Sequence, residues 1–384
     1  MGSGGSKKRS FPVFDGRFRV DETRRLGTGA FGRVFEAVDK KAESSKRERV
    51  AIKVETGKNR SVLDHEAQVH RRVAEAAKGE RDGFFLWEGR QGKHKALVMQ
   101  LMGPSLEDLV YLIARQKSGT KGLSLPTVLA VGIQAIDEVQ AVHAAGYVHR
   151  DIKPANFLMG LESVKSELRL VDYGLCKTYR DVDGDDVAAG ITGAMEKEPA
   201  RKDLSGRDTN VTGTPMYVSA RVHDGYAHGR QDDLESVGLV LVWAFKGRLP
   251  WASAADTTAG RRKRKEDASS QQSLRVRKLA TSVEDLTADM PPQFADYFRL
   301  VRALTFNDEP DYDRLRLLFQ DALAEATGSR DWHDVEMDWA RLRRKRPGVG
   351  RTPSDGSGVS SAASPSSSPP DSPTLSGRPG NENN

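Results

Sequence analysis

The chain has 384 residues, of which 37% are hydrophobic and 30% are charged, and its formal net charge is +6. This length exceeds one average domain, so two lobes or two domains with tails are expected. No run approaches the roughly 18 apolar residues of a spanning helix, so the sequence predicts no transmembrane segment. The single cysteine, Cys176, excludes an intramolecular disulfide framework and cysteine-rich zinc sites, and it indicates a reducing compartment.

Basic runs and the first residues bear on partners. Two basic runs lie at residues 261–265 and 341–346. Most such runs are solvated faces or tails, and fewer contact nucleic acid, acidic lipid or the nuclear-import machinery. The opening letters M-G-S-G-G-S match an N-myristoylation pattern at Gly2, and a flexible Gly/Ser-rich leader gives the same letters. One acyl chain would support only reversible membrane contact. Residues 1–17 are expected to form a flexible leader.

A glycine-rich turn between two strands is the first chemical motif. It reads L-G-T-G-A-F-G from Leu26. A lone G-x-G-x-x-G is ambiguous between a Rossmann turn and a lid over nucleotide phosphates. The alternating, β-branched stretch 33–38 predicts a strand, whereas a Rossmann turn would open a helix there. Two antiparallel strands joined by this turn can lay backbone N–H groups over a nucleotide's phosphates.

The next strand, residues 49–54, carries a lysine near its end. Lys53 would reach the α- and β-phosphates as a point charge, although a solvated lysine at a strand end is the plainer interpretation of that residue alone. Apolar residues recur at roughly helical spacing over residues 61–77, with Glu66 among them. A helix that brings Glu66 to Lys53 would hold the lysine in position, and Asp64 and Glu75 fit that spacing less well.

A strand then meets a helix at a corner of the chain. An apolar strand ending at Met99 leads through Gln-Leu-Met to a Gly-Pro pair, and Ser105 can cap the helix that follows. A hinge between a small β-rich lobe and a helical lobe is expected here, with an adenine ring stacked among apolar side chains. Residues 125–144 predict a buried helix that ends at Gly146 in a left-handed turn.

The octet H-R-D-I-K-P-A-N begins at His149 and places a carboxylate, a cation and a carboxamide at offsets 0, +2 and +5. A short strand after it leads into V-D-Y-G. This spacing suits phosphoryl transfer, because Asp151 can accept a hydroxyl proton and Lys153 can face a phosphate. Asn156 and Asp172 can supply oxygen ligands to Mg²⁺. A charged, solvated turn is the alternative for the H-R-D triplet alone.

With these motifs in order, the chain resembles a eukaryotic protein kinase of the casein kinase I group over roughly residues 18–325. The markers are G-P-S-L-E-D-L from Gly103, H-R-D-I-K-P-A-N-F-L-M-G from His149, Q-D-D-L-E-S-V-G from Gln231, L-P-W from Leu249 and N-D-E-P-D-Y from Asn307. S-A-R at 219–221 replaces the usual A-P-E, as expected for this group. Tyr173 and the stretch 222–235 also resemble the vaccinia-related kinases.

The resemblance implies an α+β, bilobal fold. A small antiparallel β-rich N-lobe with one main helix is expected at residues 18–102, and a larger, mostly helical C-lobe at residues 103–328. The implied activity is transfer of the γ-phosphoryl of Mg-ATP to serine or threonine hydroxyls of protein substrates. Asp151 would be the catalytic base, and Lys153 would neutralise charge on the γ-phosphate.

Further site residues follow from the same resemblance. Asn156 and Asp172 would bind Mg²⁺. The implied nucleotide-binding residues are Leu26, Gly27, Gly29, Gly32, Val34, Ala51, Lys53, Glu66, the gatekeeper Met99, and Gln100 and Met102 at the hinge. Arg150 and Asp233 have scaffold roles in the family, and a helix bearing Asp233 would brace the backbone of the catalytic loop.

Three departures from the family pattern concern substrate access and regulation. A polar insert at about 182–209 makes the segment after Asp172 longer than the group's norm, and we interpret it as a mobile, regulatory loop. Met216 stands where the group uses a basic residue to hold a substrate phosphate, so a preference for acidic or phospho-primed substrates stays open. Cys176 is expected to pack in the core, with a redox-sensitive thiol as the alternative.

Residues 329–384 are expected to form a basic and then Ser/Pro-rich disordered tail, either inhibitory when phosphorylated or merely solubilising. Two rival functions stay open. A pseudokinase scaffold is disfavoured by the intact motif residues, and a nucleic-acid or membrane-binding module would use the basic runs. Nucleic-acid binding is not expected as the main role. A monomer in the cytoplasm, the nucleus or both is expected, with reversible membrane association.

Overall fold

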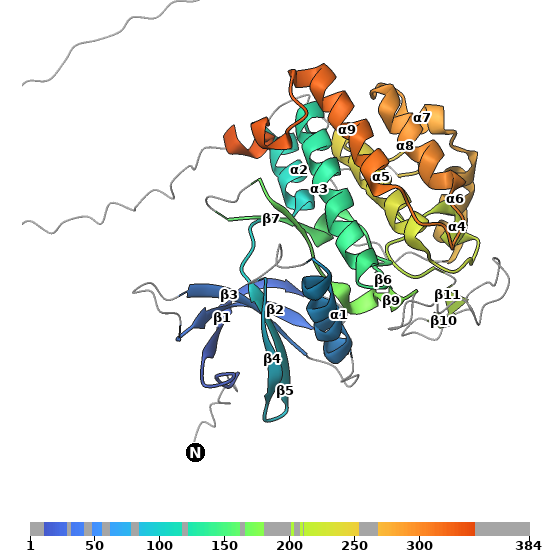
Figure 1. The fold of residues 1–384 in the computed structure, drawn as a ribbon. Coiled ribbons are helices and arrows are strands. Elements are labelled where there is room, and N and C mark those ends of the chain that lie inside the picture. The colour runs from blue at the N-terminus through green and yellow to red at the C-terminus, as the bar shows by residue number, and fades with distance from the viewer. Residues whose placement is uncertain are drawn as a thin grey trace, which may run out of the picture. The chain divides into compact units, whose positions relative to one another are not determined.

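A five-stranded antiparallel sheet forms the N-terminal lobe (Figure 1). The computed structural model describes residues 11–28, 32–41, 48–55, 62–77, 84–116, 122–161, 166–179, 201–202, 208–209, 211–252 and 268–341. The strands are β1 (Phe18–Thr28), β2 (Arg33–Asp39), β3 (Glu48–Val54), β4 (Phe85–Gln91) and β5 (His94–Gln100), in the spatial order β1-β2-β3-β5-β4. Because side chains alternate across a strand, Phe35, Ile52 and Val98 fall on one buried face of this sheet.

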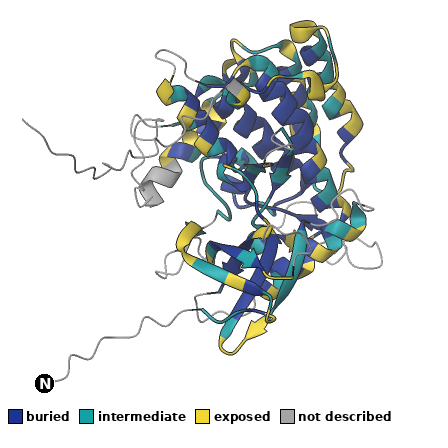
Figure 2. Ribbon diagram, turned by 90° about the vertical axis from the view of Figure 1, so that its left-hand side faces the viewer, coloured by how far each residue is buried: buried dark blue, intermediate teal, exposed yellow. Residues whose placement is uncertain are grey.

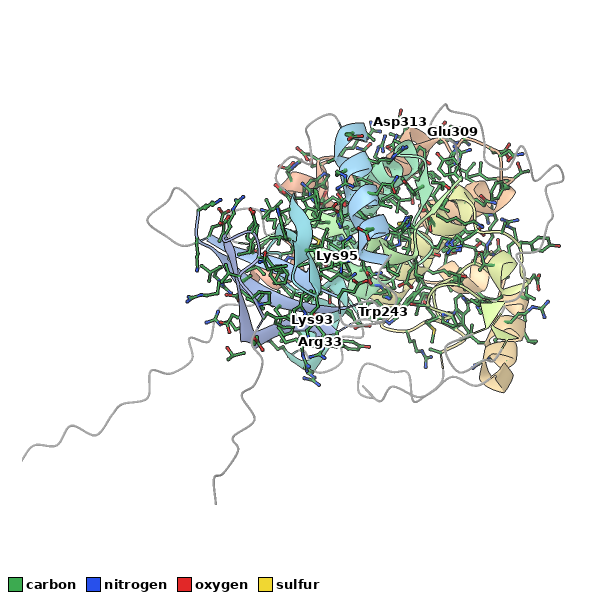
Figure 3. The ribbon with its side chains drawn as sticks, turned by 90° about the horizontal axis from the view of Figure 1, so that it is seen from below. Arg33, Lys93, Lys95, Trp243, Glu309 and Asp313 are labelled. Atoms are coloured by element: carbon green, nitrogen blue, oxygen red, sulfur yellow. The ribbon has the colours of Figure 1, made fainter. Side chains whose placement is uncertain are left out.

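One helix, α1 (Val62–Ala76), packs against the sheet. Its buried residues recur at helical spacing, and Glu66 and His70, four residues apart, belong to that inward face. Asp64 points elsewhere: it forms an ion pair with Lys95 of β5, which is labelled in Figure 3. The carboxylate that competed with Glu66 for Lys53 on spacing therefore has its own partner.

The C-terminal lobe is mostly helical. Its helices are α2 (Leu106–Gln116), α3 (Leu125–Ala144), α4 (Ala220–His223), α5 (Arg230–Lys246), α6 (Ala268–Ala280), α7 (Val283–Thr287), α8 (Pro292–Ala303) and α9 (Tyr312–Thr327). Short strand pairs join β6 (Tyr147–Val148) to β9 (Lys177–Thr178), β7 (Phe157–Met159) to β8 (Leu168–Leu170), and β10 (Arg201–Lys202) to β11 (Asp208–Thr209). The bilobal α+β fold expected from the resemblance is confirmed.

The helices α3 and α5 form the centre of this lobe and are buried along most of their length (Figure 2). By length and composition alone α3 could cross a membrane, so the sequence does contain one stretch of the required length and apolar character. However, 72% of its most apolar stretch is buried, and α3 packs against α5 and α9. The helix ends at Gly146, whose φ of +84° is the predicted left-handed turn.

Ordered packing extends beyond the boundaries expected at residues 17 and 328. Phe14 is 0% exposed, and its ring lies 6.2 Å from that of Trp87, because the sheet's apolar face needs a cover. At the other end, Met337 is buried, and the Asp338 carboxylate accepts a 2.6 Å hydrogen bond from the Ser124 N–H at the start of α3. Both segments were expected to be flexible, but each contains a buried apolar side chain, and burial of apolar surface stabilises its packing.

Several expectations fall outside the described residues. They are the myristoylation pattern at Gly2, most of the polar insert at 182–209, the basic run at 261–265, and the tail beyond residue 341. Of the insert, the structure describes only the two short strands β10 and β11.

Candidate active site

A buried lysine joins the two lobes at the cleft. The Lys53 ammonium, on β3, donates hydrogen bonds to both oxygens of Glu66 on α1, at 2.8 and 2.7 Å. It also donates to Asp172 Oδ1, at 2.8 Å. The contact of Lys53 with Glu66 predicted from spacing is thus confirmed. Burial by itself would lower the pKa of Lys53, but the two carboxylates outweigh it and raise that pKa, so the lysine is charged.

The same lysine keeps Asp172 ionised. Burial by itself would raise the pKa of this carboxyl group, but the neighbouring Lys53 charge holds the pKa below its ordinary value. Asp172 has a φ of +70° and Arg150 a φ of +69°. Non-glycine residues pay for this left-handed conformation, and such strain is concentrated at functional sites. The surrounding structure therefore holds Asp172 and Arg150 in a backbone conformation that these residue types disfavour.

The Asp151 carboxylate has a fixed set of partners. Thr214 Oγ1 donates to its Oδ1 at 2.7 Å, and Lys153 Nζ donates to its Oδ2. Asn156 Nδ2 donates to the Asp151 carbonyl oxygen at 2.9 Å. These contacts bring Asp151, Lys153 and Asn156 of the octet together, as the spacing predicted. Thr214 was missed, because 63 residues separate it from Asp151 along the chain.

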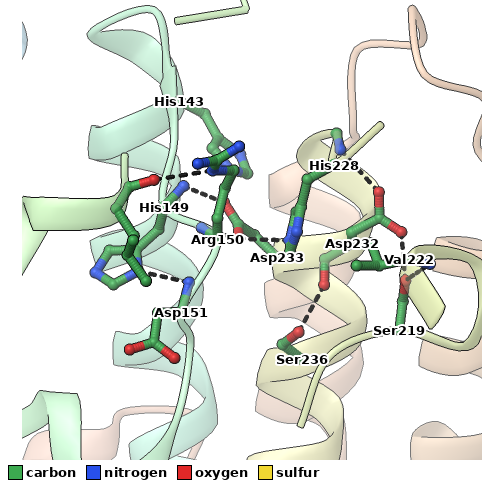
Figure 4. Close-up of polar contacts among 12 residues, drawn as sticks. His143, His149, Arg150, Asp151, Ser219, Val222, His228, Asp232, Asp233 and Ser236 are labelled. Carbon is green, nitrogen blue, oxygen red and sulfur yellow. Dashed lines mark hydrogen bonds and ion pairs between the residues drawn. The ribbon is translucent and has the colours of Figure 1, made fainter. Parts of the chain in front are cut away.

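A buried carboxylate on α5 accepts hydrogen bonds from the backbone of the catalytic loop (Figure 4). Asp233 is 0% exposed, and its two oxygens accept the backbone N–H groups of His149, at 2.6 Å, and Arg150, at 2.9 Å. His143 Nε2 lies 3.0 Å from Oδ2, and His228 Nε2 lies 3.3 Å from Oδ1. The predicted bracing of the loop by Asp233 is confirmed. The two flanking histidines were not predicted.

These contacts set the charges beneath the loop. Burial by itself would raise the pKa of Asp233, but hydrogen bonds from His143 and His228 hold that pKa well below its ordinary range. Burial lowers the pKa of both His143 and His149. The brace is therefore a carboxylate anion that accepts from two backbone N–H groups and lies beside the neutral imidazole of His143.

A column of aromatic rings connects α1 to the loop. The His70 ring centroid lies 4.4 Å from that of Tyr173, and it stacks on Phe85 at 5.7 Å with an 8° interplanar angle. Tyr173 meets His149 edge-on at 5.7 Å. The sequence reasoning passed over His70, although its position four residues after Glu66 places it on the same helix face.

Several of the expected nucleotide-binding residues lie on strands β1, β2, β3 and β5 of the sheet. Val34 of β2 pairs with Lys53 of β3, and Ala51 of β3 pairs with Met99 of β5. A Cβ atom at Gly32 would lie 2.8 Å from the Val54 carbonyl oxygen, so only glycine fits there. Leu26 is half exposed on β1, and Gly27 pairs with Val34 across the turn. Gly29 lies outside the described residues.

The hinge connects the sheet to α2. The Gln100 N–H already donates to the Phe84 carbonyl at 2.8 Å, and Met102 packs beside buried Met99. The Gly103 N–H donates to the Met159 carbonyl at 2.7 Å, which ties the hinge to the C-lobe. Ser105 Oγ accepts the Asp108 N–H, so the predicted helix cap is confirmed.

Two further expectations concern single residues. Cys176 is buried, and burial raises the pKa of its thiol, which agrees with a packing role. Met216 has the position expected after the Gly-Thr pair, and its carbonyl accepts the Trp251 Nε1–H at 3.0 Å. No cationic side chain replaces it at that position of the loop.

A family model for the protein kinase domain matches residues 20–299. The match covers well over half of the chain, so the protein belongs to the protein kinase domain family. Such a domain is a phosphotransferase that acts on proteins and uses ATP, typically with a divalent cation.

Proposed function

We propose that this protein is an active serine/threonine-protein kinase of the casein kinase I type. The observation that carries the proposal is the bonding of Lys53 to both Glu66 and Asp172. Catalysis in this family needs the β3 lysine, the helix carboxylate and the aspartate after β8 in place together. A pseudokinase that had lost turnover would have no need to keep all three, so this contact favours catalytic competence.

The acceptor chemistry centres on Asp151. Its carboxylate accepts the proton of the substrate hydroxyl as the hydroxyl oxygen bonds to the γ-phosphorus and the bond from that phosphorus to the β–γ bridging oxygen breaks. Lys153, which contacts the same carboxylate, neutralises charge on the transferred group. Lys53 holds the α- and β-phosphates. Most of the acceleration comes from positioning and charge stabilisation, because phosphoryl transfer needs little covalent help.

The donor atoms fit Mg²⁺. The amide nitrogen of Asn156 is engaged by the Asp151 carbonyl, so its amide oxygen is left as the ligand atom. Asp172 uses Oδ1 for Lys53 and has Oδ2 left. Within the described residues no group of three or more His, Cys, Asp or Glu could hold a metal, and two protein oxygens supplemented by phosphates and water suit Mg²⁺. When bound, the ion would neutralise phosphate charge.

Adenine would be held at the hinge. Because the Gln100 N–H is engaged with Phe84, the adenine contact at this residue falls to its carbonyl oxygen. Met102 is the second backbone partner in this proposal. Ala51 and Met99, paired across β3 and β5, offer apolar surface for the ring. Leu26, Gly27, Gly32 and Val34 cover the nucleotide in this proposal, and the same role for Gly29, outside the described residues, rests on the sequence motif.

Serine/threonine specificity is supported by Lys153 and Pro154, and the casein kinase I type by the motifs named above. The Met216 side chain supplies no charge for a phosphate on the substrate. We therefore propose that acidic or phospho-primed sequences are not strictly required. Cytoplasmic or nuclear location, a monomeric state and reversible membrane contact through an acylated Gly2 belong to the same proposal and rest on sequence alone.

The test is transfer of labelled phosphate from Mg-ATP to dephosphorylated casein and to acidic, primed and unprimed peptides. We expect phosphoserine or phosphothreonine, and we expect Asp151→Asn to lower kcat by roughly 10²- to 10⁴-fold without unfolding the protein. Asp296→Asn, at an exposed carboxylate of α8, is the matched control and should keep full activity. Absence of labelling by the wild type, or equal labelling by Asp151→Asn, refutes the proposal.

A further inference from the structure

A lysine of α6 is buried beneath the loop that contacts Asp151. Lys278 is 4% exposed, and its ammonium donates to two backbone carbonyls, that of Pro215 at 2.8 Å and that of Val218 at 2.5 Å. The same nitrogen lies 5.1 Å from the centroid of the Trp251 ring, a cation–π distance. It also lies 3.3 Å from His223 Nε2.

These hydrogen bonds connect Lys278 to two positions of the loop at 213–219. Pro215 and Val218 are three residues apart, so one ammonium fixes both ends of the turn between them. Trp251 holds the carbonyl of Met216 inside that turn. A second contact, the ion pair of Arg275 with Asp224 at the end of α4, fixes α6 itself. The backbone of this loop is therefore positioned by side chains of α6 and Trp251.

The loop is coupled directly to the proposed catalytic base. Thr214 Oγ1 donates to Asp151 Oδ1 at 2.7 Å. Gly213 has a φ of +97°, and a Cβ atom there would lie 2.3 Å from the Arg150 carbonyl oxygen. The loop thus fits against the catalytic loop with no spare room. Because Thr214 contacts the Asp151 carboxylate, a peptide whose hydroxyl reaches Asp151 would lie close to this loop, where Pro215 and Met216 are partly exposed.

Burying an ammonium is costly unless its donors are bonded. An apolar side chain would pack in the same space, but it would leave the Pro215 and Val218 carbonyls without the lysine as donor. The charge is therefore not needed to fill the core. Its use is to add two bonds to a turn in which the N–H groups of Tyr217 and Val218 already donate to the Thr214 carbonyl.

We propose that Lys278 is a positioning residue for the protein substrate: it sets the shape of the loop at 213–219, and through Thr214 the place of the acceptor hydroxyl at Asp151. The inference rests on the proposed kinase function. Both carbonyls that accept from Lys278 belong to the loop at 213–219. The proposal therefore gives α6 a role in binding the acceptor and none in binding the nucleotide.

Steady-state kinetics separates that role from general damage. We expect Lys278→Met to raise KM for a peptide or casein substrate about tenfold, while KM for ATP changes less than about twofold. Lys278→Arg keeps the charge and donors and should recover part of the loss. Arg277→Met is the matched control, because the guanidinium of this exposed neighbour donates to the Ser273 carbonyl of its own helix, and the variant should behave as wild type.

Hydrogen exchange gives a readout that does not need turnover. In Lys278→Met, the amides of residues 214–222 should exchange about tenfold faster than in wild type, whereas those of α3 should not change. Unchanged exchange of that stretch, or equal increases in both KM values, overturns the inference. A wild type that labels no substrate refutes the kinase proposal, and the exchange data then still decide whether Lys278 holds the loop. If Lys278→Met does not fold, Lys278→Gln, which is shorter and carries no charge, is measured the same way, and unchanged exchange and unchanged peptide KM in that variant overturn the inference.

Discussion

Two carboxylates are buried beside the cleft, and the protein compensates them differently. Glu66 is 1% exposed and relies on one cation, Lys53, which reaches it from another element and is shared with Asp172. Asp233 is 0% exposed and is surrounded by two backbone N–H groups and two histidines. The first is a contact between side chains that can separate, and the second is built into the backbone of the catalytic loop.

The difference separates assembly of the site from its support. An ion pair between β3 and α1 forms only when these elements are close, so it can report and control the active arrangement. A carboxylate bonded to the N–H groups of the loop has no alternative state within the folded protein. We therefore expect loss of Asp233 to appear mainly as lost stability, and loss of Glu66 mainly as lost activity.

The largest expected effect belongs to Asp233→Asn. The carboxylate accepts from the N–H groups of His149 and Arg150, one on each oxygen. The amide that replaces it has only one oxygen, so its NH₂ group must face one of these two donors. We expect the free energy of unfolding to fall by about 3–5 kcal/mol, with activity lost in proportion to unfolding. Urea unfolding monitored by tryptophan fluorescence measures this. A loss below about 1 kcal/mol would contradict the role of Asp233 as a brace.

Glu66→Gln is the matching change at the cleft. Gln keeps one oxygen acceptor for Lys53, and the lysine retains Asp172, so the free energy of unfolding should change by less than about 1 kcal/mol. The lysine is held less firmly, and we expect kcat/KM for ATP to fall roughly 50-fold. Unfolding and kinetics on the same preparation test both parts. Stability loss as large as that of Asp233→Asn would remove the distinction between the two carboxylates.

His223 shows a third response to burial, the loss of charge. Burial, and then the neighbouring Lys278 charge, lowers its pKa to about 4. Since the unfolded-state value is about 6.5, the unfolded chain binds the proton first, and stability is lost as pH falls from about 6.5 towards 4. Between pH 7 and 5 this histidine should cost about 2 kcal/mol of unfolding free energy.

His223→Gln isolates that contribution. The variant cannot take up the proton, so its free energy of unfolding should decline about 2 kcal/mol less than that of wild type over the same pH range. Urea unfolding at pH 7 and pH 5 provides the comparison. Parallel declines of wild type and variant would show that His223 titrates normally in the folded protein.

The smallest effect is expected at a partly exposed carboxylate. Asp338 accepts the Ser124 N–H at the start of α3, at 2.6 Å, and this contact faces solvent. Asp338→Ala should lower the free energy of unfolding by about 0.5–1 kcal/mol. Asp313→Ala, which removes only an exposed pair with Arg316, is the control and should change it by less than about 0.5 kcal/mol. Thermal unfolding measures both variants, and equal effects would mean that Asp338 does not anchor the extension after α9.

Much of the cleft was predictable because its key residues lie in short motifs. The octet from His149 and the glycine-rich turn carry their roles in local spacing, and the helical period identified Glu66 as the partner of Lys53. Thr214 and Lys278 were missed because nothing near them in sequence indicates their contacts, whereas His70 was overlooked although its helical spacing from Glu66 places it on the same face of α1. The expected ends of the ordered chain were misplaced because Phe14 and Met337 pack against surfaces formed by distant residues.

The sequence by itself determined the order of lobes, the strand and helix periods and the residue types that phosphoryl transfer needs, because these depend on local spacing and side-chain chemistry. Only the tertiary structure decided which charges compensate one another. Lys53 meets Asp172 across 119 residues, and the N–H of His149 meets Asp233 across 84. A buried charge has lost its hydration and needs a protein partner. That partner is the group that the packed chain brings within hydrogen-bond distance.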